Sequence, residues 1–147
     1  MPLALEHIAA LVEWPEAEMD EAAFLAEILD RTGALLLLDV ANLYANARNH
    51  RYDPLAYLGR LPLHRLAYVH VGGGVERDGV YHDTHAHRVD PAALDLLERL
   101  AALVDVPGVM LERDDDFPPA GELTADLDAI RAAVERGAAR RQGWPVA

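Results

Sequence analysis

Hydrophobic and polar positions alternate along the chain in four similar units. In each unit a short apolar run is followed by a polar loop and then by a segment with apolar side chains at helical spacing. Short runs that are apolar on both faces are typical of strands in a buried parallel sheet. The pattern therefore predicts parallel strands at residues 3–6, 34–39, 65–71 and 109–112.

The segments between the predicted strands contain helix signals. Asp20 is a good N-cap for the first helix, and an aspartate followed by proline opens two others. The predicted helices are residues 21–31, a short segment from residue 54, residues 91–104 and residues 121–136. The segments expected to be irregular are a polar loop at 42–52, a long loop at 72–88 and a frayed tail at 138–147.

Four strand–helix units correspond to half of an eight-unit TIM barrel. The 147 residues suffice for one domain with a real core, but they fall short of the ~250 residues of a complete barrel. The predicted fold is α/β, a single half-barrel domain over residues 1–147 with parallel strands. Because a half-barrel leaves two strand edges unpaired, we expect either a homodimer or another chain that supplies the complementary half.

Composition excludes several classes of function. The net charge of −12, with no basic stripe, argues against nucleic acid as a partner. No apolar run approaches the ~20 residues of a membrane span, and the first residues lack the basic region of a secretory signal. The absence of cysteine excludes disulfides, thiolate metal sites and a cysteine nucleophile. We expect a cytoplasmic protein that does not bind a membrane.

Each predicted strand ends in a residue that can bind a metal, namely Glu6, Asp39, His70 and Glu112. Parallel strands place their carboxyl ends at the same edge of the sheet, which is the active-site edge of α/β barrels. We therefore expect these four side chains to converge on one pocket. Their mixture of oxygen and nitrogen donors suits iron, manganese or zinc.

Carboxylates at the ends of apolar strands require compensation. Burying several acids together is costly unless a cation or a basic partner neutralises them. A metal ion is one solution, and an ion pair with Arg48 or Arg113 is the alternative. His70 has an alternative of its own, because a lone histidine at the end of an apolar strand is often a hydrogen-bonded core residue.

A histidine-rich loop follows the third predicted strand. Asp83 and His85 are two residues apart, and extended backbone would place both side chains on one face, able to grip one ion. His82 and His87 are interpreted as solvated surface residues. The glycine run at 72–74 is interpreted as a permissive loop, since it lacks the helix opening and the lysine of a phosphate-binding loop.

Three further residues are candidates for supporting or substrate-binding roles. Asn42, three residues after Asp39, could ligate weakly, orient a ligand or only shape a turn. Arg113 could hold an anionic substrate group or only balance charge. Asp114 adds an acid at the expected rim of the pocket.

Taken together, these residues resemble the xylose-isomerase-like TIM-barrel family that includes the methanobactin biosynthesis protein MbnB and its relative TglH. The similarity runs in order over nearly the whole chain. The matching stretches are Leu5-Glu6, Glu21 to Phe24, Thr32-Gly33, Leu37 to Val40 with Asn42, Asn49-His50, Leu61-Pro62, Val69-His70, Asp83 to His85 and Leu111 to Asp114.

The resemblance implies that the chain is the C-terminal half of a non-haem iron oxygenase that uses dioxygen to modify cysteine residues of a ribosomal peptide. It also implies a site with two or three iron ions and a partner protein that presents the peptide. The residues that would hold the metals are Glu6 as a bridging ligand, together with Asp39, His70, Glu112, Asp83 and His85. The last two would help to hold a further ion.

The chain departs from that family in three ways. The family is about twice as long, and its N-terminal half supplies two histidine ligands that this chain does not contain. His7 and Ala41 stand where the family usually has asparagine. Gly74 stands where the family usually has a second histidine.

Two other hypotheses stay open at this point. A truncated, non-catalytic half-barrel that dimerises and binds a single metal would explain the missing histidines. A manganese- or zinc-dependent sugar isomerase or hydrolase would share the barrel architecture, and fold alone does not exclude it.

Overall fold

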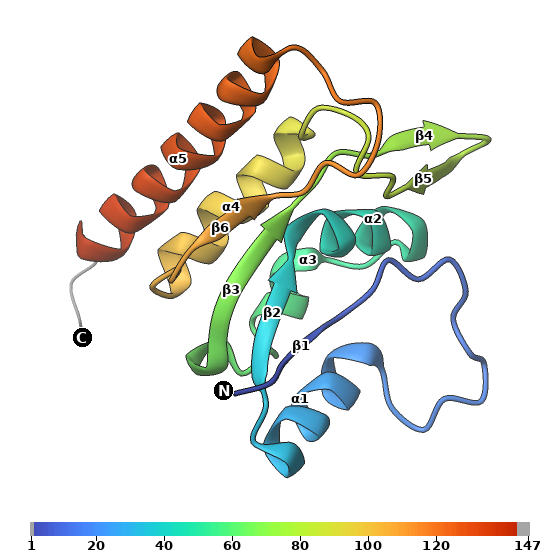
Figure 1. The fold of residues 1–147 in the computed structure, drawn as a ribbon. Coiled ribbons are helices and arrows are strands. Elements are labelled where there is room, and N and C mark those ends of the chain that lie inside the picture. The colour runs from blue at the N-terminus through green and yellow to red at the C-terminus, as the bar shows by residue number, and fades with distance from the viewer. Residues whose placement is uncertain (1, 144–147) are drawn as a thin grey trace.

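Residues 2–143 are described by the computed structural model of this chain. The parallel sheet has the order β1-β2-β3-β6, formed by β1 (Ala4–Glu6), β2 (Leu35–Asp39), β3 (Leu66–Val71) and β6 (Val109–Leu111). The strands lie side by side in the order in which the chain makes them (Figure 1). The predicted strands are confirmed, with bounds that differ by no more than one residue.

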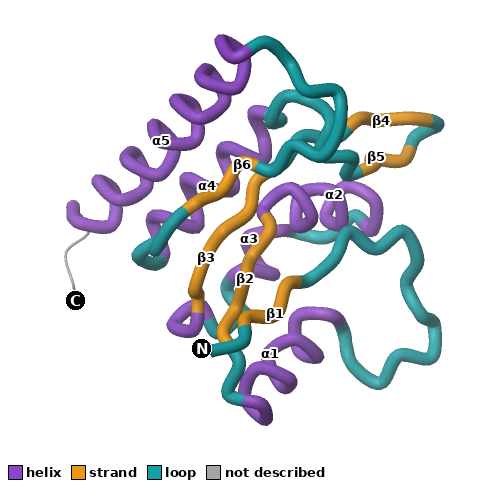
Figure 2. The backbone as a smooth tube through the Cα atoms, in the orientation of Figure 1, coloured by secondary structure: helices purple, strands orange, loops and turns teal. Residues whose placement is uncertain are grey.

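Helices follow the strands, and a β-hairpin extends beyond the end of β3 (Figure 2). The helices are α1 (Glu21–Thr32), α2 (Val40–His50), α3 (Pro54–Leu58), α4 (Pro91–Leu103) and α5 (Ala120–Gly143), with a 3-10 helix at Leu63–Arg65. The hairpin strands are β4 (Val75–Arg77) and β5 (Val80–His82). Within the described residues, no helix is long and apolar enough to cross a membrane.

Side-chain caps explain where several helices begin. Asp20, Asp53 and Asp90 each accept a backbone N–H bond from the first turn of the helix that follows. α3 and α4 open with proline, as the sequence predicts. Gly33 ends α1 in the left-handed conformation (φ 71°), which glycine adopts without steric cost.

The largest difference from the sequence prediction is α2, which occupies the segment expected to be a polar loop. Asp39 caps this helix by accepting a bond from the backbone N–H of Asn42 at 2.8 Å. Val40 and Leu43 are buried in the core. The polar residues of α2 bond to neighbouring segments, and those partners are not visible in the local sequence.

A second difference lies in the long loop predicted at 72–88, which contains the hairpin of β4 and β5. The two strands pair antiparallel, and the turn between them places Asp78 and Gly79 at positive φ. An Asp-Gly turn is a recognised signal for a tight hairpin, so the sequence did contain the information.

The last helix is longer than the sequence predicts. α5 continues to Gly143, so the tail expected to fray from residue 138 is helical as far as that residue. Arg140 forms a 2.7 Å ion pair with Glu98 on α4, which holds this end of α5 in place. Residues 144–147 lie outside the described part of the chain.

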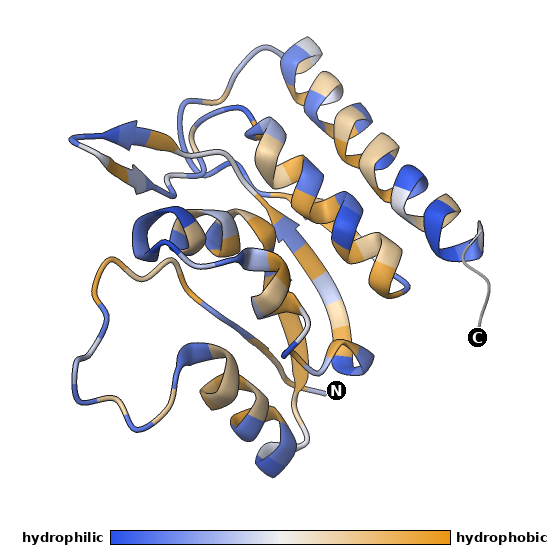
Figure 3. Ribbon diagram, turned by 180° about the vertical axis from the view of Figure 1, so that it is seen from behind, coloured by the Kyte–Doolittle hydropathy of each residue, from blue (hydrophilic) through white to orange (hydrophobic). Residues whose placement is uncertain are grey.

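One hydrophobic cluster joins the sheet to the helices that cover it. Leu36 and Leu38 of β2 and Val69 of β3 are fully buried in this cluster, together with Leu97 and Leu100 of α4. Figure 3 shows apolar residues concentrated in the strands and along one side of α4. The core therefore lies between the helical layer and one face of the sheet.

The opposite face of the sheet is open. The register pairs Leu37 with Tyr68 and His70 with Met110, so these side chains share one face. Tyr68 is 39% exposed and Met110 is 41% exposed. Among the described residues, no strand pairs with the outer edge of β1 or β6, and the sheet does not close. The fold is α/β with a parallel four-stranded sheet, as in part of a TIM barrel.

Candidate metal centre

The carboxyl ends of the four parallel strands bring together the side chains that the sequence singled out. Glu6, Asp39, His70 and Glu112 each offer one donor atom, and these atoms all lie within 4.8 Å of one another. Asp39 and His70 occupy paired positions in β2 and β3. The structure thus places the four residues together as expected, and metal ligation by them stays a prediction.

His70 lies between two of these carboxylates. Its Nδ1 is 3.1 Å from Glu6 Oε1 and 3.1 Å from Glu112 Oε1. A buried, hydrogen-bonded histidine was the alternative to a metal ligand, and both interpretations are compatible with these contacts. Asp39 is fully buried whereas Glu6 is exposed, so the cluster extends from the interior of the sheet to its open face.

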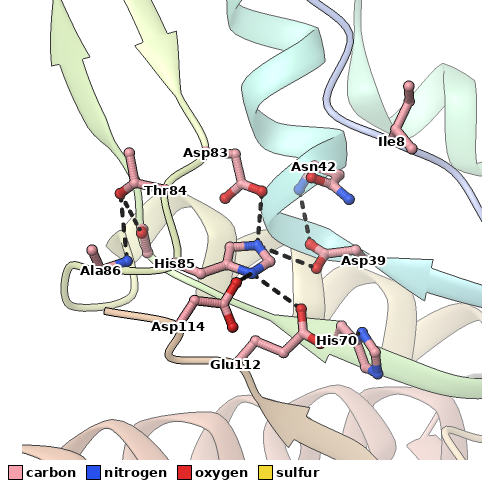
Figure 4. A network of polar contacts seen from close by, with 12 residues as sticks. Ile8, Asp39, Asn42, His70, Asp83, Thr84, His85, Ala86, Glu112 and Asp114 are labelled. Atoms are coloured by element: carbon pink, nitrogen blue, oxygen red, sulfur yellow. Dashed lines mark hydrogen bonds and ion pairs between the residues drawn. The ribbon is translucent and has the colours of Figure 1, made fainter. Parts of the chain in front are cut away.

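The histidine-rich loop adds a second imidazole to the same cluster (Figure 4). His85 Nε2 lies 2.7 Å from Asp83 Oδ2 and 3.7 Å from Asp39 Oδ2. Its Nδ1 lies 3.1 Å from Glu112 Oε2 and 3.5 Å from Asp114 Oδ2. Carboxylates from three segments therefore surround one ring, and His85 joins the strand ends to the loop.

The backbone of this loop differs from the expectation. Extended backbone was expected to place Asp83 and His85 on one face, but His85 is left-handed, with φ 49°. A turn brings the two side chains into contact instead, and Thr84 Oγ1 supports it through contacts with Ala86 N at 3.4 Å and His87 Nδ1 at 2.9 Å. Unusual backbone of this kind concentrates at functional sites.

The local environment raises the pKa of two groups in the cluster. The hydrogen bond and the charge of Asp83 raise the pKa of His85 to about 9, although burial of the ring opposes the shift. Burial raises the pKa of Asp39 to about 6. At neutral pH a protonated His85 therefore lies among the carboxylates, where a positive charge is most favourable.

The donor set fits a cation. Asp39 Oδ2 and Asp83 Oδ1 are buried and have no hydrogen-bond partner among the described residues. Such oxygens are costly to bury unless a proton donor or a cation satisfies them. Carboxylates combined with imidazoles suit iron, manganese or zinc. The residues that would hold an ion are Glu6, Asp39, His70 and Glu112, with Asp83 and His85 beside them.

Asn42 orients one of the carboxylates. Its backbone N–H donates to Asp39 Oδ1 at 2.8 Å, and its Nδ2 donates to the carbonyl of His7 at 3.0 Å. The bond to Asp39 comes from the backbone and the side chain holds the backbone of His7, so the role of Asn42 at a metal stays a prediction. His7 itself is buried, and burial lowers the pKa of its ring to about 4, so it is neutral beside Glu6.

Neither arginine considered as a neutralising partner pairs with the strand-end acids. Arg48 pairs with Glu76 on the hairpin. Arg113 lies 3.5 Å from both Glu122 and Asp126 of α5, and only 5% of its side chain is exposed. The alternative of arginine compensation is therefore wrong for the described residues. Arg113 balances the charge of Glu122 and Asp126, and a role in holding an anionic substrate group stays a prediction.

Asp126 is a supporting residue that the sequence analysis missed. It is 2% exposed, and its Oδ1 accepts bonds from Arg88 at 3.0 and 2.9 Å. Arg113, on its other side, also donates to the carbonyl of Ala86 at 2.6 Å. The two arginines therefore bracket the loop that carries His85. The sequence did indicate that Asp126 is buried, because it falls within the apolar stripe of its helix.

The glycine run at 72–74 is a packing surface for the histidine loop. A Cβ on Gly72 would lie 2.4 Å from the ring of His85. Cβ atoms on the next two glycines would lie 2.1 Å from the carbonyl oxygen of His87 and 2.3 Å from that of His82. Bare backbone here lets the loop fold onto the end of β3. His82 and His87, which were expected to be solvated, are half-buried in this contact.

Comparisons with known proteins agree with one another. The model of the family described as "RiPP precursor modification enzyme MbnB/TglH/ChrH" matches residues 1–135. A UPF0276 protein of Streptomyces avermitilis is 52% identical over 140 residues, which cover 95% of this chain and 29% of that protein. UPF0276 proteins of Bordetella bronchiseptica and Caulobacter vibrioides are 42% and 40% identical over 94% and 97% of this chain.

The match covers only part of each relative. The chain spans 50% of the Bordetella and Caulobacter proteins and less of the Streptomyces one. The resemblance expected from the sequence is nevertheless confirmed, because the family model covers most of the chain. The chain belongs to the MbnB/TglH/ChrH family of RiPP precursor modification enzymes.

Proposed function

We propose that this chain is the C-terminal portion of a metal-dependent enzyme, with a multinuclear iron site, that modifies cysteine residues of a ribosomal peptide. The description of its family supports a ribosomal peptide precursor as the substrate, and cysteine as the modified residue is part of the proposal. The convergence of Glu6, Asp39, His70 and Glu112 carries the proposal, since it supports metal dependence. Iron held there would supply the redox chemistry with dioxygen that cysteine modification requires, and zinc or manganese would fit the same donors.

The chain's own residues would control charge and protons at such a site. Two glutamates flank His70 Nδ1 at 3.1 Å each and fix the orientation of the ring. His85 is protonated at neutral pH and would lose that proton to a bound cation. Asn42 occupies Asp39 Oδ1, which leaves Oδ2 for the ion.

The rest of the barrel would come from outside these 147 residues. The chain spans half of two relatives, and its sheet is open at β1 and β6 within the described residues. We propose that a complementary N-terminal half-barrel pairs with these edges and adds donors to the cluster. A partner protein that presents the peptide is a second proposed component.

A non-catalytic homodimer is the second candidate. The open face of the sheet exposes Tyr68 and Met110, and two copies could cover this face for each other. Each copy would then keep only its own strand-end donors and hold at most one weakly bound ion. The sugar isomerase and hydrolase hypotheses gain no support from the family description.

Metal content measured together with molar mass tests the proposal. Protein would be purified anaerobically from iron-supplemented cells, with Asp39→Asn and His70→Gln as matched variants. More than one iron ion per parent chain, lost in both variants, would support an iron enzyme. A homodimer with no ion, or with iron that both variants retain, would contradict it. Mass spectrometry of a cysteine-containing precursor peptide after exposure to the loaded protein and dioxygen would then test the reaction.

A further inference from the structure

Helix α2 begins at one candidate ligand and lies beside the two segments that carry others. Asp39 caps its first turn. The segment that follows Glu6 is hydrogen-bonded along the helix, and strand β5, which precedes Asp83, packs against it (Figure 1). The helix is therefore placed to fix three parts of the cluster relative to one another.

Asn46 holds the segment after Glu6. Its Nδ2 donates to the carbonyl of Ile8 at 2.9 Å, and its Oδ1 accepts from the backbone N–H of Ala10 at 2.8 Å. The residue is only 1% exposed. A carboxamide that bonds both a carbonyl and an N–H of one segment acts as a neighbouring strand would, so it fixes the position and the direction of that segment.

Asn49 holds the hairpin in the same way. Its Nδ2 donates to the carbonyl of Tyr81 at 2.8 Å, and its Oδ1 accepts the backbone N–H of Tyr81 at 2.9 Å. Tyr81 lies two residues before Asp83, whose carboxylate contacts His85 at 2.7 Å. Two asparagines on one helix therefore make the same reciprocal bond to different segments of the cluster.

Two neighbours of Asn46 reinforce the first contact. Asn42 and His50 lie one turn before and one turn after it, and they bond to the carbonyls of His7 at 3.0 Å and of Ala10 at 2.6 Å. Residues spaced by four form one stripe along a helix. The backbone that leaves β1 is thus held at several consecutive points.

We propose that Asn46 and Asn49 are positioning residues of the metal centre. Asn46 places Glu6 and Asn49 places Asp83, each relative to Asp39 at the start of the same helix. The inference rests on the proposed function, because it takes these acids to be metal ligands. Loss of a residue that supports a metal ligand lowers affinity by about 10–100-fold.

The test compares Asn46→Ala and Asn49→Ala with Asp95→Ala, which alters an exposed residue of α4. Zn²⁺ binding is titrated by calorimetry, and Co²⁺ binding is followed by its absorption spectrum. Glu6→Gln and His85→Gln show which binding event depends on each half of the cluster. We expect N46A to weaken the event that depends on Glu6 by about 10–100-fold and N49A the event that depends on His85. D95A should bind like the parent.

Amide hydrogen exchange in the metal-free protein gives a readout that does not depend on a metal. N46A should expose the amide of Ala10, and N49A the amide of Tyr81, each leaving the other protected. The proposal is overturned if both variants expose both amides, if both weaken the same binding event, or if neither has an effect. Where alanine prevents folding, the glutamine variants keep the amide group but displace it. Each should still expose only the amide of its own segment.

A parent protein that binds neither Zn²⁺ nor Co²⁺ would contradict the proposed function. A different outcome is a parent that binds while the two variants do not weaken different binding events. That result would contradict only the role of the two asparagines. The exchange pattern decides in either case whether each asparagine holds its own segment.

Discussion

His85 determines the charge balance of the cluster at the scale of single residues. Its ring contacts carboxylates from several segments, and Asp83 raises its pKa to about 9. Asp39, buried beside it, has a pKa raised by burial to about 6. In the metal-free protein the proton on His85 therefore provides part of the positive charge that a bound cation would provide. A cation that uses His85 as a ligand must displace this proton.

Metal affinity is expected to rise with pH for this reason. His85 keeps its proton up to about pH 9 and Asp39 keeps its proton below about pH 6, so protons compete with the ion at both groups. Calorimetric titration with Zn²⁺ between about pH 5.5 and 8, in buffers of different ionisation enthalpy, should show increasing affinity and about one proton released per binding event.

An exposed histidine provides the control for this pH dependence. His64 lies away from the cluster, so His64→Gln should leave the pH profile unchanged. His85→Gln should remove the pH dependence of the affinity above about pH 6, because Asp39 is already ionised there and no proton competes with the metal. An affinity that does not vary with pH in the parent would show that His85 takes no part in binding.

Asp39→Asn is expected to stabilise the metal-free protein while it removes tight metal binding. The pKa of Asp39 is raised from 3.8 to about 6 on folding, so the ionised carboxyl opposes folding above about pH 6. This penalty fades as the pH falls toward 3.8. We expect the free energy of unfolding to rise by about 1–3 kcal/mol at pH 7 and by much less at pH 4, as measured by urea denaturation.

An exposed acid gives the comparison. Glu27→Gln on α1 should change the free energy of unfolding by less than about 0.5 kcal/mol, because surface substitutions have small effects. If D39N destabilises the protein at pH 7, the attraction between Asp39 and protonated His85 outweighs the cost of burial. The prediction that the ionised Asp39 carboxylate opposes folding would then be wrong.

At the scale of elements, the sequence predicted what local patterns determine. Four apolar runs specified the strands, and parallel strands bring Asp39 and His70 to one edge. α2 was missed because its asparagines looked like loop residues, whereas Asn46 is satisfied by Ile8, 38 residues away. The role of Asp126 depended likewise on how α5 packs, which no local pattern shows. The part of the site that the sequence did not predict is the part that depends on contacts between distant segments.

Gly72→Ala tests how β3 and the histidine loop fit together. A Cβ at this position would lie 2.4 Å from Cδ2 of His85, so the ring must move. We expect a loss of about 1–3 kcal/mol in the free energy of unfolding from overpacking. Zn²⁺ affinity should fall by about 10-fold or more, because a displaced ligand misses the ion. Calorimetry and the NMR signals of His85 would measure both effects.

Gly121 provides a matched control, since nothing lies within 4 Å of a Cβ built there. Gly121→Ala in the first turn of α5 should leave Zn²⁺ binding and the His85 signals unchanged. Equal losses of affinity in the two glycine variants would show that the close contact with His85 is not what matters.

The described residues form part of a barrel, and the candidate site lies at the carboxyl ends of its strands. Helices cover one face of the sheet, and the other face exposes Tyr68 and Met110 near the cluster. The count of strand–helix units predicted this half-barrel from the sequence. The sequence did not show which surface covers the open face, because exposed apolar residues do not identify the partner that they contact. Two relatives are twice as long as the matched region, so their remaining halves are candidates for the surface that covers this face.

Met110→Gln is expected to weaken association on the open face without unfolding the chain. The side chain is 41% exposed in the single chain, so a polar residue of similar size should leave its own stability nearly unchanged. If a complementary half-barrel or a second copy covers this face, the dissociation constant from analytical ultracentrifugation should rise about 10-fold, because an apolar contact is lost. Leu103→Gln, at an exposed position on α4, should have little effect. Equal effects of the two substitutions, or no effect of M110Q, would show that the partner binds elsewhere.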